Sequence, residues 1–393
     1  MASVGFYKYV SEASYETQSL YLDNGSATMT AEELRSLGTK RILFLCDAKY
    51  QNYRIISEFK KKYEEEGFRL FSYTRREKHL TLTDIRGGIR VFNEFNCDTV
   101  VAIGGCSEID CGKYIAALAA NYGRSAEDFD GINNIRRDMT VLCCVMTDNS
   151  YAASSAFAEY YDDTERKWHT AFSSYLIPQI AVIDMDVSMR TDMKESASSS
   201  MLSLGLAFES YASPYSSFSP EYKANALDSC LGIISNIDKM RNNPGDTYLR
   251  RMNSIGGFYA GLASRMTGFG YGKLLMNALF EKYHTADGGL YLRIIAAMIE
   301  TMPKLYGECA AELSHKAHLC TNGTSNEQAG DVFVNYLRMT VRRHSPDSVC
   351  PSVDDQTIEK IASDVKKEAA VYGLEKASVQ DLSNVLRCLG ADV

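Results

Sequence analysis

The first half of the chain alternates short apolar runs with amphipathic stretches, and this alternation restricts the possible folds more than any other feature. The runs 41–46, 98–103 and 140–146 are almost wholly apolar, which is typical of strands buried on both faces. Between them, 53–66 and 83–96 have the periodicity of amphipathic helices. Repeated alternation of strand and helix predicts a parallel sheet with helices on both faces.

The pattern changes near residue 187. A last apolar run at 180–184 is followed by long helical stretches with almost no strand signal. The sequence therefore predicts two domains, a Rossmann-like α/β domain at 1–187 and an all-helical domain at 188–393. The helical stretches expected in the second domain are 192–213, 220–242, 246–266, 289–302, 328–343 and 354–371.

Composition argues against several classes of function. The formal net charge is −8 and basic residues are not clustered, which disfavours a nucleic-acid surface. No apolar run reaches the roughly 18 residues of a membrane span, and the N-terminus lacks the features of a signal peptide. Eleven cysteines without paired spacing fit reduced thiols better than disulfides. We therefore expect a cytoplasmic protein that binds neither nucleic acid nor a membrane.

The segment around Gly104 carries the most functional information. A buried strand ends at Gly104 and Gly105, and a helix is expected to begin at Ser107, which can cap it, with Asp110 three residues later. Glycine lets the backbone approach a ligand, and the N-terminus of the following helix favours an anion such as a diphosphate. Two glycines after a strand are also common in plain tight turns, so the motif alone leaves both interpretations open.

The same segment resembles a motif of a known family. Iron-dependent alcohol dehydrogenases and their relatives carry Gly-Gly-Gly-Ser-x-x-Asp-x-x-Lys after a strand. This chain reads Gly-Gly-Cys-Ser-x-x-Asp-x-x-Lys from Gly104 to Lys113. Further segments similar to this superfamily, which includes dehydroquinate synthase, are 40–47, 157–167, 178–186, 209–211 and 377–382. The resemblance implies a dehydroquinate synthase-like fold and a bound NAD or NADP.

The resemblance also assigns residues to the cofactor. Asp47 would lie near the adenosine ribose, where a carboxylate prefers a free 2′-hydroxyl and so favours NAD over NADP. Thr147 and Lys167 would line the nicotinamide side. Tyr151 stands where the family's threonine-rich loop has a glycine, which predicts an altered cofactor geometry. The full set assigned to the cofactor is Asp47, Gly104, Gly105, Ser107, Asp110, Lys113, Thr147 and Lys167.

The resemblance implies that the family's metal site is lost. Relatives hold the metal with an Asp and a His four residues apart on one helix and with two later His. Here the first pair is replaced by Leu202 and Leu206, the next helix has Ala260 and Ser264, and the last ligand position is Asp287. Because zinc and iron sites need three or four protein ligands, no metal is expected.

The function expected from these features is a metal-independent, NAD(P)-dependent oxidoreductase acting on a small carbonyl compound or alcohol in the cleft between the domains. Metal-independent maleylacetate reductases of the same superfamily give a precedent. His284 is the expected proton donor, and Asp287 would orient it. Two alternatives stay open: an inactive or repurposed ligand-binding protein, and lyase or cyclase chemistry like that of dehydroquinate synthase. Relatives are commonly dimers or larger, so a homo-oligomer is expected.

Overall fold

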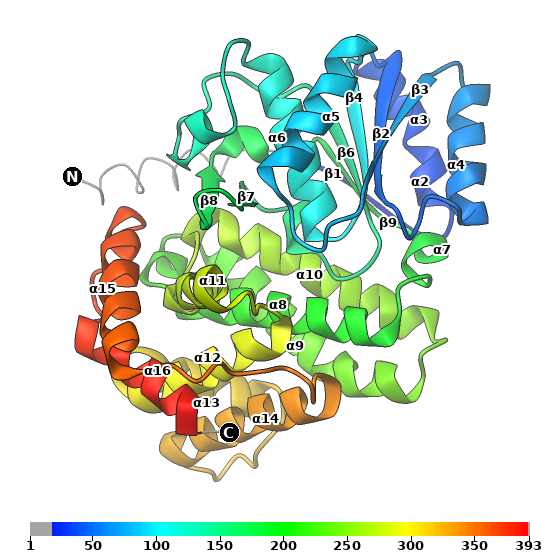
Figure 1. Ribbon diagram of the computed structural model, residues 1–393. Coiled ribbons are helices and arrows are strands. Elements are labelled where there is room, and N and C mark those ends of the chain that lie inside the picture. Colours follow the sequence, from blue (N-terminus) through cyan, green and yellow to red (C-terminus); the bar gives the residue numbers. More distant parts are fainter. Residues whose placement is uncertain (1–17, 392–393) are drawn as a thin grey trace.

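The computed structural model describes residues 18–391, and its N-terminal half is built on a six-stranded sheet (Figure 1). All neighbouring strands in this sheet pair in parallel, as the sequence predicts. The strand order is β1 (Ser19–Leu22), β9 (Ile180–Ile183), β6 (Val141–Met146), β4 (Thr99–Gly104), β2 (Arg41–Asp47) and β3 (Arg69–Arg75).

Helices cover both faces of the sheet. Ile42 and Phe44 of β2 face one apolar cluster, in which Phe59 of α4 (Arg54–Glu65) is buried. Leu43 and Leu45 face the opposite cluster, with α5 (Leu82–Glu94) and α6 (Cys106–Ala120). Both faces of β2 are therefore buried, which explains its continuous apolar run. Two short helices, α2 (Ser26–Met29) and α3 (Ala31–Ser36), precede β2.

A small second sheet lies beside the first. Its order is β5 (Gly131–Ile132), β8 (Lys167–Phe172) and β7 (Phe157–Asp162), with β7 and β8 antiparallel. Helix α6 packs against β7 through Lys113, whose ammonium group donates to the carbonyl of Phe157 at 2.6 Å. The second sheet is therefore packed directly against α6.

After β9 the described chain is helical, and the helices form the lower part of the molecule in Figure 1. The fold class is thus confirmed, while the boundary at residue 187 stays a prediction. None of the helices in residues 18–391 is long and apolar enough to cross a membrane. The helices are α7 (Met185–Ser188), α8 (Met193–Ala212), α9 (Pro220–Asn242), α10 (Thr247–Thr267), α11 (Tyr271–Tyr283), α12 (Gly288–Thr301), α13 (Pro303–Lys316), α14 (Asn326–His344), α15 (Asp355–Val371) and α16 (Val379–Ala391). Single 3₁₀ turns are found at Glu127–Phe129, Tyr151–Ala153, Ser174–Leu176 and Pro214–Phe218.

Helix α10 joins the two halves. It lies directly against the loop that follows β6, with the amide of Asn149 donating to the carbonyl of Asn253 at 2.7 Å. The hydroxyl of Ser154 donates to the carbonyl of Phe258 at 2.5 Å. This contact fixes the helices against the carboxyl edge of the sheet, where ligands bind in open α/β folds.

Candidate active site

The glycine turn follows β4 and leads straight into α6. Gly105 is the N-cap of α6, with φ of −86°, so its backbone does not require a glycine. A Cβ on Gly105 would meet open space, with the Oε2 atom of Glu108 as its nearest neighbour at 3.9 Å. The backbone N–H groups of Cys106 and Ser107 have no hydrogen-bond acceptor within residues 18–391. The turn therefore has space and two free donors for an anion.

A carboxylate of the chain already lies in this turn. Glu108 Oε2 accepts a hydrogen bond from the Gly105 N–H at 3.1 Å, and Glu108 Oε1 pairs with the guanidinium of Arg75. Burial raises the pKa of Glu108, and the charge of Arg75 opposes that shift. Glu108 thus provides the cap of α6 that the sequence assigned to Ser107. That assignment was wrong, because α6 begins at Cys106 and the Ser107 hydroxyl donates to the carbonyl of Lys78 at 3.4 Å.

Asp110 and Lys113 lie deeper, where α6 meets β7. Lys113 is fully buried and donates to the carbonyl of Ser155 at 3.0 Å as well as to Phe157. Asp110 accepts from the Glu159 N–H at 3.3 Å, and burial raises its pKa to about 7. Lys113 therefore fixes α6 to the second sheet, while Asp110 also borders the cleft described below.

Of the remaining residues assigned to the cofactor, two lie near the glycine turn and one does not. Asp47 ends β2 and accepts from the Lys49 N–H at 2.8 Å. Thr147 follows β6, and its N–H donates to the carbonyl of Gly104 at 3.1 Å. Because β2, β4 and β6 are neighbours, both residues lie at the same edge of the sheet as the glycine turn. Lys167, in contrast, is exposed at the start of β8 and does not line the cleft.

A cleft of about 520 Å³ connects the start of α6 with the helical domain. Ser107 and Asp110 border it on one side, and Leu202, His284 and Asp287 border it on the other. The sequence-predicted proton donor thus shares a cavity with the first turn of α6, which follows the glycine turn. The other lining residues are Lys78, His79, Leu80, Cys106, Tyr151, Glu159, Trp168, Ser198, Lys273, Met276, Asn277, Phe280 and Ala286.

His284 ends α11 in the left-handed region, with φ of 52°, and its side chain is exposed. Its ring meets Tyr161 and Phe280 edge-on, with centroids 6.2 Å and 5.7 Å away. Asp287 does not orient it, since no hydrogen bond joins the two side chains in the described part of the chain. The Asp287 carboxylate instead caps α12, accepting from the Leu290 N–H at 2.7 Å and from the Ser348 hydroxyl at 2.8 Å.

Comparison with known protein families gives a match over the first half of the chain. Residues 17–185 match the family described as "Iron-containing alcohol dehydrogenase". This match covers the α/β half of the protein and ends where the helices after β9 begin. This confirms the resemblance found in the sequence.

Individual proteins similar to this chain match most of its length. The NAD-dependent methanol dehydrogenase of Bacillus methanolicus is 22% identical over 385 residues, 93% of this chain and 96% of that protein. Alcohol dehydrogenase 4 of Schizosaccharomyces pombe is 24% identical over 327 residues, 82% of this chain and 76% of that protein. A crystal structure of a 1,3-propanediol oxidoreductase superposes with a TM-score of 0.84 at 18% identity, covering 94% of this chain and 97% of that chain. An alcohol dehydrogenase from Oenococcus oeni gives 0.84 at 16% identity, covering 95% and 99%. These structural matches show that the whole chain has the fold of iron-containing alcohol dehydrogenases.

The positions that the sequence resemblance assigns to metal ligands carry side chains that are unsuited to hold iron. Leu206 and Ala260 are buried apolar residues, and Leu202 is half-buried at the cleft. Ser264 is buried and donates to the carbonyl of Gly261 at 2.6 Å. Only Asp287 has a carboxylate, which is engaged as a helix cap. Between residues 18 and 391, no group of three or more His, Cys, Asp or Glu is arranged to hold a metal ion.

A buried ammonium group lies in the cleft wall, which the sequence did not predict. Lys273 is 5% exposed, and its Nζ lies 2.8 Å and 3.0 Å from the two carboxylate oxygens of Glu159 and 2.8 Å from Asn277 Oδ1. The Asn277 amide also donates to Glu159 at 2.8 Å. A lysine among the apolar residues at the start of α11, together with a glutamate in the buried strand β7, was the available sequence signal.

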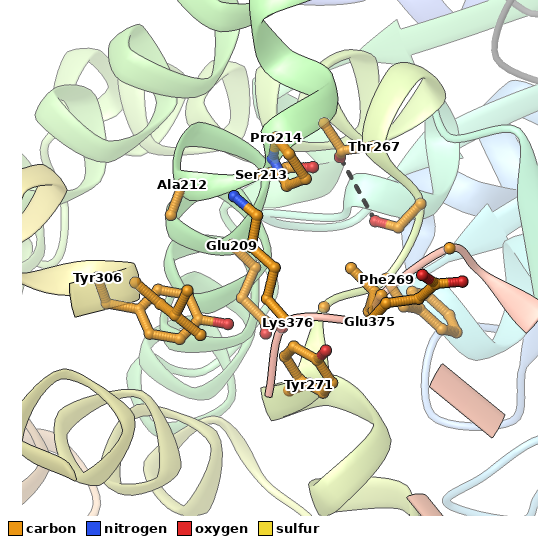
Figure 2. A pocket seen from close by; sticks show the side chains of 15 residues that line it. Glu209, Ala212, Ser213, Pro214, Thr267, Phe269, Tyr271, Tyr306, Glu375 and Lys376 are labelled. Carbon is orange, nitrogen blue, oxygen red and sulfur yellow. Dashed lines mark hydrogen bonds between the residues drawn. The ribbon is translucent and has the colours of Figure 1, made fainter. Parts of the chain in front are cut away.

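A second cavity, of about 280 Å³, is lined by Glu209 of α8 and by the segment between α10 and α11 (Figure 2). None of the residues that the sequence assigned to the cofactor or to catalysis lines it. The buried Glu209 carboxylate accepts from the N–H groups of Gly272 at 2.7 Å and Lys273 at 3.1 Å, and from the Tyr291 hydroxyl at 2.5 Å. Glu209 therefore caps α11 and thereby positions Lys273 in the cleft wall.

Proposed function

We propose that this protein is an NAD(P)-dependent oxidoreductase that interconverts a small alcohol and its carbonyl compound in the cleft, without a metal ion. The observation that carries the proposal is that one cavity joins the first turn of α6 with His284. The family domain and the NAD-dependent methanol dehydrogenase among the relatives support the reaction class. Asp47 at the end of β2 favours NAD over NADP.

The residues around the glycine turn suit a dinucleotide in part. The open side of Gly105 and the N–H groups of Cys106 and Ser107 would hold the diphosphate, whereas the Gly105 N–H is engaged by Glu108. When bound, the nicotinamide gives or takes a hydride.

His284 would supply the proton to the carbonyl oxygen. Its ring faces the cleft, and its exposure allows the imidazole to recover a proton from water. Lys273 has acceptors for its three hydrogens in Glu159 and Asn277, so it contributes positive charge to the wall rather than a proton. Leu202 gives the cleft an apolar surface at a position that the sequence resemblance assigns to a metal ligand.

Cofactor oxidation with a panel of small aldehydes and ketones tests the reaction, and metal analysis tests its independence of metal. We expect NADH oxidation by a small carbonyl compound, with a rate unchanged after dialysis against a chelator. Stoichiometric iron or zinc in the purified protein would contradict the metal-free mechanism. Failure of every carbonyl compound and alcohol with both NAD(H) and NADP(H) would contradict the oxidoreductase.

The role of His284 is tested with His284→Asn. Asparagine tolerates left-handed backbone, so the turn should survive. We expect kcat to fall about 100-fold with a smaller change in KM, since general acid catalysis contributes roughly 10²–10⁴-fold. His318→Asn is the matched control, because His318 is also exposed and left-handed, with φ of 55°, but lies outside the cleft. Equal kcat in both variants would remove His284 from the mechanism.

A ligand-binding protein without catalytic activity is the second candidate. The observation that favours it is the carboxylate of Glu108 in the cofactor turn, together with the loss of metal-binding side chains at Leu202 and Leu206. Ligand binding without turnover of any alcohol or carbonyl compound would support this candidate over the first.

A further inference from the structure

The carboxylate of Glu108 lies in the glycine turn, at the N-terminus of α6. Glu108 lies in the first turn of α6 with its carboxylate directed back toward the turn, where Oε2 binds the Gly105 N–H at 3.1 Å. The N-terminus of a helix attracts anions through its free N–H groups and its dipole. In this chain part of that attraction is already satisfied by Glu108 itself.

Arg75 holds Glu108 in this position. The Arg75 side chain is fully buried at the end of β3, and Nη1 pairs with Glu108. Its Nη2 donates to the carbonyl of His79 at 2.8 Å and lies 3.3 Å from Asp84 Oδ2. Asp84 is itself fixed by the capping box that it forms with Thr81 at the start of α5. The pair is therefore anchored in two elements, unlike an exposed ion pair, whose partners exchange readily with water.

The two glycines of the turn have different surroundings. A Cβ on Gly104 would overlap the Cβ and Cγ atoms of Glu108, so Gly104 must be a glycine because Glu108 packs against it. Gly105 has open space where its Cβ would be. One glycine thus accommodates the internal carboxylate, and the other leaves room for a ligand.

A diphosphate that approaches this turn meets two obstacles. The Gly105 N–H is already bonded, and the Glu108 carboxylate repels the incoming charge, with Asp47 on the neighbouring strand adding to the repulsion. Removing the Glu108 charge would end this repulsion and leave the guanidinium of Arg75 with one carboxylate partner, Asp84, beside the turn. Both changes favour an anion.

We propose that Glu108 is an internal competitor for the diphosphate site and sets the dinucleotide affinity of this protein. The inference depends on the proposed function only in taking a dinucleotide as the ligand. Glu108 limits binding, so the affinity of this turn for a dinucleotide should rise when the Glu108 carboxylate is replaced.

Titration of purified protein with NADH, followed by its fluorescence, and with ADP by calorimetry tests the inference. ADP carries the diphosphate without the nicotinamide, so it measures the turn alone. We expect Glu108→Gln to lower both dissociation constants at least tenfold relative to the unmodified protein. Asp84→Asn is the matched control, because it removes the other carboxylate of Arg75 but keeps the Glu108 charge in the turn, and it should change affinity less than twofold.

The pattern of results distinguishes failure of this inference from failure of the proposed function. Equal or weaker nucleotide binding by Glu108→Gln, or equal strengthening by Asp84→Asn, overturns the inference and leaves the proposed function standing. Tight binding of NADH and ADP by Glu108→Gln without turnover of any substrate overturns the proposed function and supports the inference. Absence of nucleotide binding in all three proteins overturns both.

Folding of the variants is checked by thermal melting before titration. If Glu108→Gln is unfolded, Glu108→Asp replaces it. The aspartate keeps the charge near Arg75 but is one methylene too short to hold the Gly105 N–H, so it should still strengthen ADP binding. Unchanged ADP affinity in a folded Glu108→Asp protein overturns the inference.

Discussion

At the level of single residues, several carboxylates of this protein act as ligands of helix N-termini. Glu108 binds the N–H of Gly105, Glu209 binds those of Gly272 and Lys273, and Asp287 binds that of Leu290. Every helix leaves its first N–H groups without an internal partner, so a nearby carboxylate is strongly held there. A sequence motif does not distinguish such a cap from a catalytic or ligand-binding carboxylate, which is why Asp287 was assigned a role beside His284.

The capping role of Asp287 makes a prediction about stability. Asp287→Ala should lower the free energy of unfolding by about 1 kcal/mol, because the Leu290 N–H and the Ser348 hydroxyl lose their acceptor. Asp287→Ser should recover most of this loss, since serine caps helices nearly as well as aspartate. Urea denaturation of the three proteins measures both differences. A serine variant as unstable as the alanine variant would show that capping is not the main role of Asp287.

At the level of elements, the sequence predicted those whose pattern is local. The strands β2, β4 and β6 appear as apolar runs because both of their faces are buried, and α8, α9 and α10 appear as long helical stretches. The sequence missed α11, because Gly268, Gly270 and Gly272 interrupt its start.

Helix α11 is also stabilised by a residue far away in the chain. Glu209 from α8 binds the N–H groups at its start, and that contact exists only in the folded protein. Lys273 and Asn277 lie on this helix, so the charged wall of the cleft could not be predicted either. The glycine turn, in contrast, was predicted because its residues are adjacent in sequence, whereas the Arg75–Glu108 pair that occupies it joins two elements.

The close packing of α10 makes a second prediction. A Cβ on Gly261 would overlap the Ser154 hydroxyl and the backbone carbonyl of Tyr151, and a backbone atom cannot move aside cheaply. Gly261→Ala should therefore lower the free energy of unfolding by about 1–3 kcal/mol. Gly232→Ala in α9 is the control of opposite sign, because a Cβ there meets open space and alanine favours helix by roughly 0.5–1 kcal/mol. Stabilisation by both substitutions would contradict the close contact between α10 and the loop after β6.

At the level of the whole molecule, buried charges link the two halves on either side of the cleft. Lys273 of α11 pairs with Glu159 of β7, and within the helical half Arg250 of α10 is held by the carbonyl of Thr191 at 2.6 Å. Arg250 also lies 4.0 Å from the buried carboxylate of Asp148, in the loop after β6. Because a buried charge that loses its partner is costly, these pairs favour one relative placement of the halves and so maintain the cleft.

Asp148 gives this junction a dependence on pH. Burial raises the pKa of Asp148 from its usual 3.8 to about 6, against the opposing charge of Arg250. The folded protein therefore binds this proton more tightly than the unfolded chain, and the resulting stability is present at pH about 4 and is lost as the pH rises through about 6. Asp148→Asn cannot ionise, so the stability of the unmodified protein relative to this variant should fall by on the order of 2 kcal/mol between pH ~4 and ~7. Urea denaturation of both proteins across this range measures the difference, and parallel stability curves would show that Asp148 is ionised in the folded protein throughout.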